Sequence, residues 1–76
     1  MANVSLSEFF ASVAAQQEIY PDWRYGQTCF NTLLRWRPDL AERVRGTDQD
    51  PFHARNNNDP RMVRFMRFLA EEWEDA

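Results

Sequence analysis

Residues 59–73 read DPRMVRFMRFLAEEW, and this stretch decides the fold class of the chain. Asp59 is a favourable N-cap residue, and Pro60 suits the first position of a helix, where its missing amide loses no hydrogen bond. The apolar residues that follow recur three and four positions apart, as on one face of a helix. They are Met62, Val63, Phe65, Met66, Leu69, Ala70 and Trp73. We therefore expect a helix from Pro60 to about Asp75 that packs a broad apolar stripe against a core.

Similar patterns occur earlier in the chain. Ser5 and Glu8 have the spacing of a capping box, and the apolar residues after them recur at helical intervals. This first helix should end before Pro21, because proline disfavours helical geometry in the residue that precedes it. A second helix is expected to start within residues 22–25 and to run to about Trp36.

A short helix and a long loop complete the prediction. Pro38 fits the first turn of the short helix, and Gly46 fits the position just past its end. Residues 46–58 are rich in turn-forming aspartate and asparagine, and Phe52 is expected to hold this loop against the body. We therefore expect an all-α fold, a compact bundle of three main helices and one short helix, as a single domain over residues 1–76.

The amino-acid composition indicates the cellular compartment and the classes of partner that the protein is expected to have. A single cysteine forms no internal disulfide, so a secreted disulfide scaffold is excluded. No signal peptide and no membrane-spanning segment is recognised, so we expect a cytoplasmic protein. The net charge of −3 disfavours a dedicated binder of nucleic acid or of anionic membranes. All nine basic residues are arginine, which fits either the codon bias of a GC-rich genome or selection for bidentate contacts.

The residue types needed for catalysis do not form a recognisable constellation. The only histidine, His53, lies in the predicted loop, whereas Cys29 lies among apolar residues of a helix, as buried structural cysteines do. Asp48 and Asp50 near His53 match neither an EF-hand nor a paired Cys/His zinc pattern, and turn formation explains them more simply. We therefore expect no enzymatic activity, no metal site and no cofactor.

The polar side of the last predicted helix is the main candidate for binding a partner. Phe68 falls outside the apolar stripe, between two arginines, as an interface anchor would. It would otherwise pack under the loop or against another helix. Arginines precede acids along this helix, against the preference of the helix macrodipole, which indicates either pairing with arginines elsewhere in the chain or a partner's surface. The candidate residues are Arg61, Arg64, Phe68, Glu71, Glu72, Glu74 and Asp75.

The segment from residue 35 to residue 45 supports an alternative, a nucleic-acid-binding or transcription-modulating protein. It holds four arginines against two acids, and Trp36 lies beside them, so it could contact phosphates and stack on a base. The simpler interpretation is a solvated face with Trp36 in the core, and no recognition-helix pattern is present. The candidate residues are Arg35, Arg37, Arg43 and Arg45.

Two stretches carry a resemblance to known sequences. Residues 21–31 contain PDWRYGQT followed by FN, and residues 37–52 contain RPDLA, RGTD and DPF. They resemble a group of small uncharacterised proteins encoded by bacteriophages and prophages, which share a DWRYGQT…RGTDxDPF-like motif. The resemblance covers about residues 20–53 and implies a phage origin, but no activity.

The motif residues serve either the fold or a binding surface. As fold residues, Asp22 is expected to cap the second helix, and Trp23 and Tyr25 to staple its start to the core. Side-chain hydrogen bonds are expected to hold the long loop, from Arg45, Thr47 and Asp50.

Phage accessory proteins of this size often occupy a surface on a host protein, including components of anti-phage defence such as CRISPR effectors. By this analogy we expect a non-enzymatic binding protein that modulates or inhibits a host protein in the host cytoplasm. A homodimer is a further expectation that suits so small a core.

Overall fold

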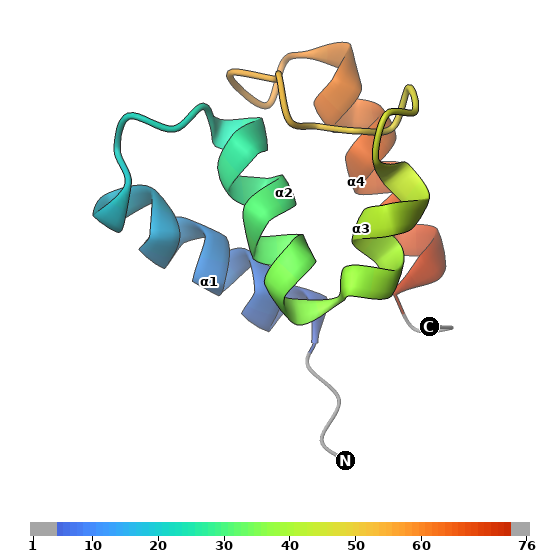
Figure 1. Ribbon diagram of the computed structural model, residues 1–76, viewed down its shortest axis with the longest axis horizontal. Coiled ribbons are helices and arrows are strands. Elements are labelled where there is room, and N and C mark those ends of the chain that lie inside the picture. Colours follow the sequence, from blue (N-terminus) through green and yellow to red (C-terminus); the bar gives the residue numbers. More distant parts are fainter. Residues whose placement is uncertain (1–4, 74–76) are drawn as a thin grey trace.

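Four helices make up most of residues 5–73, the part of the chain that the computed structural model describes (Figure 1). In chain order they are α1 (Leu6–Ile19), α2 (Tyr25–Trp36), α3 (Pro38–Val44) and α4 (Pro60–Glu72). No strand occurs among the described residues. The predicted all-α fold of three main helices and one short helix is confirmed.

The starts of the first and last helices follow the sequence pattern. The Glu8 amide donates to the Ser5 hydroxyl at 3.0 Å, and the Ser5 amide donates to the Glu8 carboxylate at 3.1 Å, which completes the predicted capping box. At the start of α4 the Arg61 amide donates to the Asp59 carboxylate at 2.8 Å, with Pro60 in the first turn. These interactions satisfy amides that have no acceptor within the helix.

The start of α2 differs from the prediction. Arg24 occupies the N-cap position and its side chain makes no capping hydrogen bond, so the predicted cap by Asp22 is wrong. The Gly26 amide in the first turn instead donates to the Ala54 carbonyl at 2.8 Å. A distant loop therefore supplies to α2 an acceptor of the kind that a neighbouring side chain supplies to α1 and α4.

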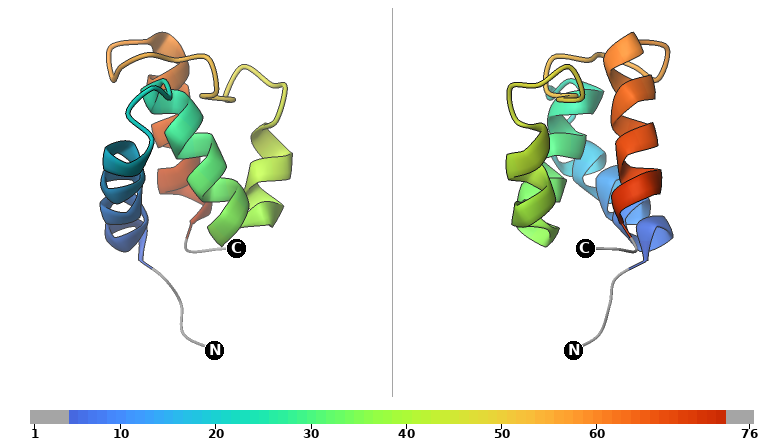
Figure 2. Two further views of the ribbon diagram at one scale, coloured as in Figure 1. Left: turned by 60° about the vertical axis from the view of Figure 1, so that its left-hand side comes forward. Right: turned by 90° about the vertical axis from the view of Figure 1, so that its right-hand side faces the viewer.

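All four helices contribute to one hydrophobic core. α2 packs most closely against α1 and α3, and α4 lies behind the α2–α3 pair in Figure 1 and beside it in Figure 2. The ring of Phe9 lies 5.2 Å from the ring of Trp73, which joins the first turn of α1 to the end of α4. Large side chains that are fully buried include Phe9, Val13, Leu33, Leu40, Val44, Met62, Phe65 and Leu69. No helix within residues 5–73 is both long enough and apolar enough to cross a bilayer.

The buried face of α4 is rotated from the predicted stripe. Met62 and Phe65 are buried as expected, but Val63 of the stripe is 53% exposed and Phe68 is only 5% exposed. The Phe68 ring lies under the guanidinium of Arg43 in α3, at 5.3 Å. The alternative that Phe68 packs against another helix is therefore confirmed, and its prediction as an exposed interface anchor is wrong, because Arg43 of α3 covers its ring.

The loop between α3 and α4 is held by its own side chains. Gly46 follows the end of α3 with a φ of 74°, the left-handed conformation that favours glycine. The Thr47 hydroxyl donates to the Val44 carbonyl at 2.7 Å. Asp50 accepts from the amides of Gly46 and Phe52, at 2.7 and 3.0 Å. The predicted loop-holding roles of Thr47 and Asp50 are confirmed.

This loop docks on the start of α2. The Phe52 ring lies 6.0 Å from the Phe30 ring, edge to face, and the Arg24 guanidinium lies 5.4 Å from the Phe52 ring. A Cβ atom on Gly26 would lie only 1.8 Å from the Pro51 carbonyl oxygen, so the backbones approach as closely as glycine allows. The start of α2 and the loop around residues 51–54 therefore pack on each other, and the residues at this contact have a structural role.

Candidate binding groove between α1 and α2

The arginines predicted to bind a partner at the start of α4 make contacts within the fold. Arg61 pairs with the Asp59 carboxylate at 3.1 Å. The Nε of Arg64 donates to the Asp48 carbonyl, which ties α4 to the preceding loop. Together with the buried Phe68, these contacts give the proposed surface a role in the fold.

One of the acidic residues at the end of α4 also makes an ion pair within the fold. Glu72 pairs with Arg43 of α3 at 2.9 Å, which confirms internal pairing for this residue. Glu71 is exposed. Glu74 and Asp75, and with them the predicted end of the helix, lie outside the described residues.

Three arginines of the predicted basic segment share one arrangement. Each guanidinium lies 5.2–5.4 Å from the centre of an aromatic ring and pairs with a carboxylate at 2.9–3.0 Å. The sets are Arg37 with Trp73 and Asp39, Arg43 with Phe68 and Glu72, and Arg45 with Phe30 and Glu42. Arg45 therefore does not hold the loop as predicted. The hydrogen bond from Arg37 lowers the pKa of Asp39.

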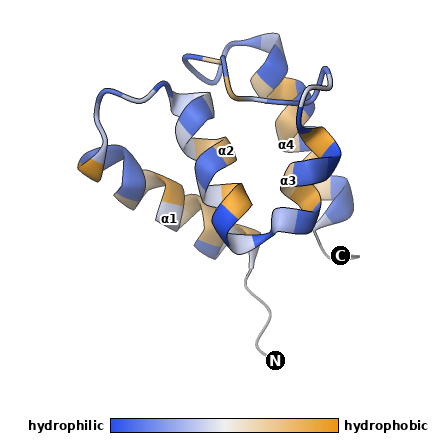
Figure 3. Cartoon of the chain, viewed as in Figure 1, coloured by the Kyte–Doolittle hydropathy of each residue, from blue (hydrophilic) through white to orange (hydrophobic). Residues whose placement is uncertain are grey.

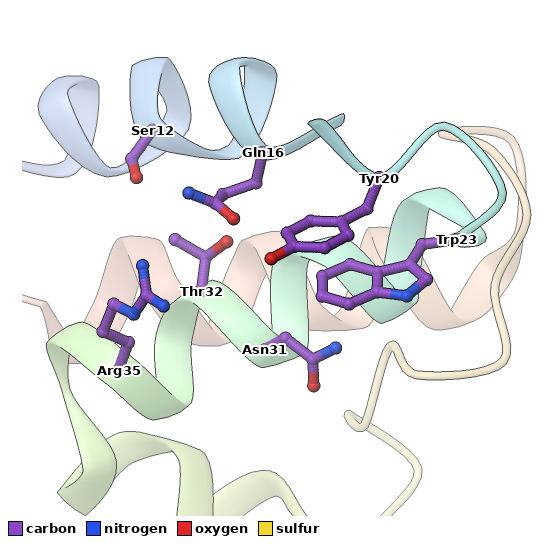
Figure 4. Close-up of a pocket in the computed structure, with 7 residues that line it drawn as sticks. All are labelled: Ser12, Gln16, Tyr20, Trp23, Asn31, Thr32 and Arg35. Atoms are coloured by element: carbon purple, nitrogen blue, oxygen red, sulfur yellow. The ribbon is translucent and has the colours of Figure 1, made fainter. Parts of the chain in front are cut away.

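Arg35 is the exception in this segment. It is exposed, and none of the described residues accepts a hydrogen bond from it or pairs with it. It lines a groove of about 60 Å³ between α1 and α2, with space for a few water molecules. The lining residues are Ser12, Gln16, Tyr20, Trp23, Asn31, Thr32 and Arg35 (Figure 4).

One end of the groove is aromatic. The rings of Tyr20 and Trp23 stack with centroids 4.1 Å apart and planes 10° apart. Tyr20 is 43% exposed and the preceding Ile19 is 61% exposed, so apolar side-chain surface is accessible at the C-terminal end of α1. Figure 3 shows a hydrophobic segment at this end of the helix. Tyr25 packs against the core as predicted, whereas Trp23 stacks on Tyr20 and does not form the predicted staple.

The rest of the groove is polar and rich in hydrogen-bond donors. Figure 4 shows Gln16 of α1 facing α2, the Tyr20 hydroxyl pointing into the space, and Arg35 at the opposite end. The side chains of five lining residues make no hydrogen bond with any described residue: Ser12, Gln16, Tyr20, Asn31 and Arg35. No carboxylate of residues 5–73 lines the groove. These groups are therefore available to hydrogen-bond with solvent or with another molecule.

The floor of the groove differs, because its hydrogen bonds are made within the fold. The Thr32 hydroxyl donates to the Thr28 carbonyl at 2.7 Å. Gln17 donates to the Thr28 hydroxyl at 2.6 Å, which ties α1 to α2 next to the groove residues Gln16 and Thr32 in the hydrogen-bond network. The helices therefore hold the groove's walls at a set separation, which favours binding without rearrangement.

A second hollow lies between the long loop and the start of α4. It brings the predicted residues Arg61 and Arg64 close to Asp48, Asp50 and His53. The contacts of Asp50 and Arg64 within the fold account for two of these polar groups. Among the described residues, no three histidine, cysteine, aspartate or glutamate side chains are grouped so as to hold a metal ion.

Cys29 is a core residue, as its sequence context predicts. It is fully buried, and burial raises the pKa of its thiol to about 12. Burial also raises the pKa of Tyr25 to about 12, helped by the charge of Cys29 and by a hydrogen bond with it. The reactive thiolate is therefore scarce at neutral pH.

Sequence reasoning missed the groove, although one signal pointed to it. Two aromatic residues, Tyr20 and Trp23, lie on either side of the Pro21–Asp22 turn directly after the first predicted helix, a pattern that favours an aromatic turn. The remaining lining residues belong to polar helix faces that look like ordinary solvated surface. Comparison of the chain with known protein families, with curated proteins and with solved structures gives no match.

Proposed function

We propose that the protein acts by binding another protein, without catalysing a reaction, and that the groove between α1 and α2 is the contact surface. The observation that supports this most is a groove with the Tyr20–Trp23 stack at one end and the exposed Arg35 at the other. Tryptophan, tyrosine and arginine are the residue types that contribute most to binding energy at protein interfaces. The donors between them supply directional contacts that can select a partner.

The proposed partner is a host protein. The support is the resemblance of residues 20–53 to proteins encoded by phages, from which we infer an infected or lysogenic host. Occupying a surface of a host factor, for example an anti-phage defence component such as a CRISPR effector, would modulate or inhibit it. We propose that this contact is made in the host cytoplasm.

A photo-crosslinker on each of two exposed positions tests the proposal. Ile19 adjoins the groove and Val63 lies on α4, and their side chains are similarly exposed, at 61% and 53%. We replace each in turn by p-benzoylphenylalanine and irradiate cells that carry the gene. A discrete protein adduct is expected from position 19 and not from position 63.

Two further variants show whether the adduct depends on the groove. Tyr20→Ala removes half of the aromatic stack and should abolish the adduct from position 19. Leu34→Ala is the matched control, because Leu34 is exposed on α2 outside the groove, and it should leave the adduct unchanged. An adduct from position 63 alone would place the contact on α4, and no protein adduct from either position would contradict the proposed function.

A further inference from the structure

The chemistry of the groove identifies the kind of group that it receives. Resting on the proposed function, we infer that the groove binds a carboxylate of the partner protein, an aspartate or glutamate side chain next to an apolar residue. The carboxylate lies among Arg35, Asn31 and Gln16, and the apolar neighbour covers Tyr20 and Ile19.

The hydrogen-bond donors of the lining side chains, with no carboxylate among them, favour an anion as the bound group. Every polar side chain that lines the groove can donate a hydrogen bond, and Arg35 supplies the only formal charge among these lining residues. An ionised carboxylate accepts up to about four hydrogen bonds and forms its strongest ones with guanidinium groups. A cation would meet Arg35 without a compensating acid, and a neutral group would leave most donors without an acceptor.

The other arginines of the same segment show what Arg35 lacks. Arg37, Arg43 and Arg45 each combine an aromatic ring with a carboxylate supplied by this chain. Arg35 pairs with no acid of the described residues, and the aromatic pair of its groove lies at the opposite end. A partner's carboxylate would supply at Arg35 the acid that this chain supplies to the other three arginines.

The volume of the groove and the apolar surface at its rim indicate which kind of molecule supplies the anion. A volume of about 60 Å³ suits a group of a few heavy atoms, such as a carboxylate. The exposed apolar surface of Ile19 and Tyr20 lies at the rim, and burying it favours an apolar neighbour on the same partner. An acidic side chain within a protein segment supplies both parts, whereas a free ion or a nucleic-acid backbone supplies only the charge.

A pair of capped dipeptides tests this chemistry directly. N-acetyl-Leu-Glu amide is titrated into ¹⁵N-labelled protein, and the side-chain N–H signals of Gln16, Asn31 and Arg35 should shift in a saturable way. N-acetyl-Leu-Gln amide should bind about tenfold or more weakly, because it lacks the charge that strengthens hydrogen bonds to arginine. Equal shifts with the two peptides would contradict the inference.

Variants of Arg35 separate charge from shape. Arg35→Gln should weaken binding of the glutamate peptide about tenfold, and Arg35→Lys should recover part of it, since lysine keeps the charge without the bidentate fork. Asn31→Asp places an acid in the groove and should abolish binding. Arg67→Gln is the matched control, because Arg67 is an exposed arginine on α4, and it should change nothing.

Two more results would overturn the inference. Inorganic phosphate or a mononucleotide that shifts the same signals and binds more tightly than the glutamate peptide would identify a phosphate site. A crosslink from position 19 that persists in Arg35→Gln would show a protein partner that needs no carboxylate, so this inference would fail while the proposed function stands. Loss of the crosslink in Tyr20→Ala and in Arg35→Gln supports both.

Discussion

At the scale of single residues, Gly26 permits the docking of the long loop on α2. Its amide donates to Ala54, and the carbonyl of Pro51 occupies the place where a side chain would begin. Gly46 is different, because a Cβ atom added there would meet nothing within 4 Å and only its positive φ favours glycine. The two glycines of the chain therefore serve two separate physical needs.

The substitution Gly26→Ala should be the more damaging of the two. The added methyl group must displace loop backbone, and such overpacking costs about 1–3 kcal/mol or more in the free energy of unfolding. Gly46→Ala should cost about 1 kcal/mol, the strain of a left-handed conformation in a non-glycine residue. Urea denaturation measures the free energy of unfolding of both variants. Equal losses would show that the loop backbone does not lie in close contact with Gly26.

The buried thiol of Cys29 and the hydroxyl of Tyr25 predict how stability depends on pH. Both groups hold their proton more tightly in the folded chain, with pKa values of about 12 against ordinary values of 9.0 and 10.0. Between pH 9 and pH 12 the unfolded state therefore binds fewer protons than the folded state. Stability is fully present below this window and is lost as the pH rises through it.

Urea denaturation at about pH 8 and about pH 10.5 should show a lower free energy of unfolding at the higher pH. Cys29→Ala removes one of the two groups, so its stability should fall less over the same interval. An equal decrease in the free energy of unfolding in the wild type and in the variant would show that Cys29 does not contribute to the pH dependence. A thiol reagent at about pH 8 should modify Cys29 only after unfolding, since the native thiol is buried and protonated.

At the scale of the element, α4 shows how a neighbouring helix decides which residues are buried. Its apolar residues span more of the helix circumference than one contact can cover. α3 packs on the side of Phe68, where Arg43 covers the ring and pairs with Glu72. Val63 on the other side is left half exposed. The reversed charge order along α4 is consistent with this contact, because an acid near its end meets a base of α3.

Phe68→Ala should therefore destabilise the fold and not merely weaken binding. Removing a buried phenylalanine costs about 3–5 kcal/mol through lost burial and the cavity left behind. Val63→Ala, on the exposed face of the same helix, should change the free energy of unfolding by less than about 0.5 kcal/mol. Thermal and urea denaturation followed by circular dichroism measure both variants. A Phe68→Ala protein as stable as the wild type would contradict the packing of α3 on α4.

At the scale of the whole molecule, one aromatic cluster joins elements that are distant in sequence. The Phe9 ring lies 6.3 Å from that of Trp36 in α2 and 5.2 Å from that of Trp73 at the end of α4. A domain this small has one core, so loss of a central side chain weakens every helix at once.

Phe9→Leu should lower the free energy of unfolding by about 1–3 kcal/mol, because the smaller side chain leaves part of the central space unfilled. In urea denaturation, the unfolding transitions followed by far-ultraviolet circular dichroism and by tryptophan fluorescence should move to lower urea concentration together. A fluorescence change that precedes the loss of helix would show that α1 detaches on its own.

The sequence alone determined the helices and where they begin. The Ser5–Glu8 capping box, the Asp59 cap and the prolines at helix starts act over three or four residues, so their effects are readable locally. Tertiary structure decided which aromatic residues are buried, which acids pair with the arginines, and how α2 is capped by Ala54. It also decided the groove, whose lining comes from two helices and the turn between them. These features depend on how the helices cross, and no short-range pattern encodes that.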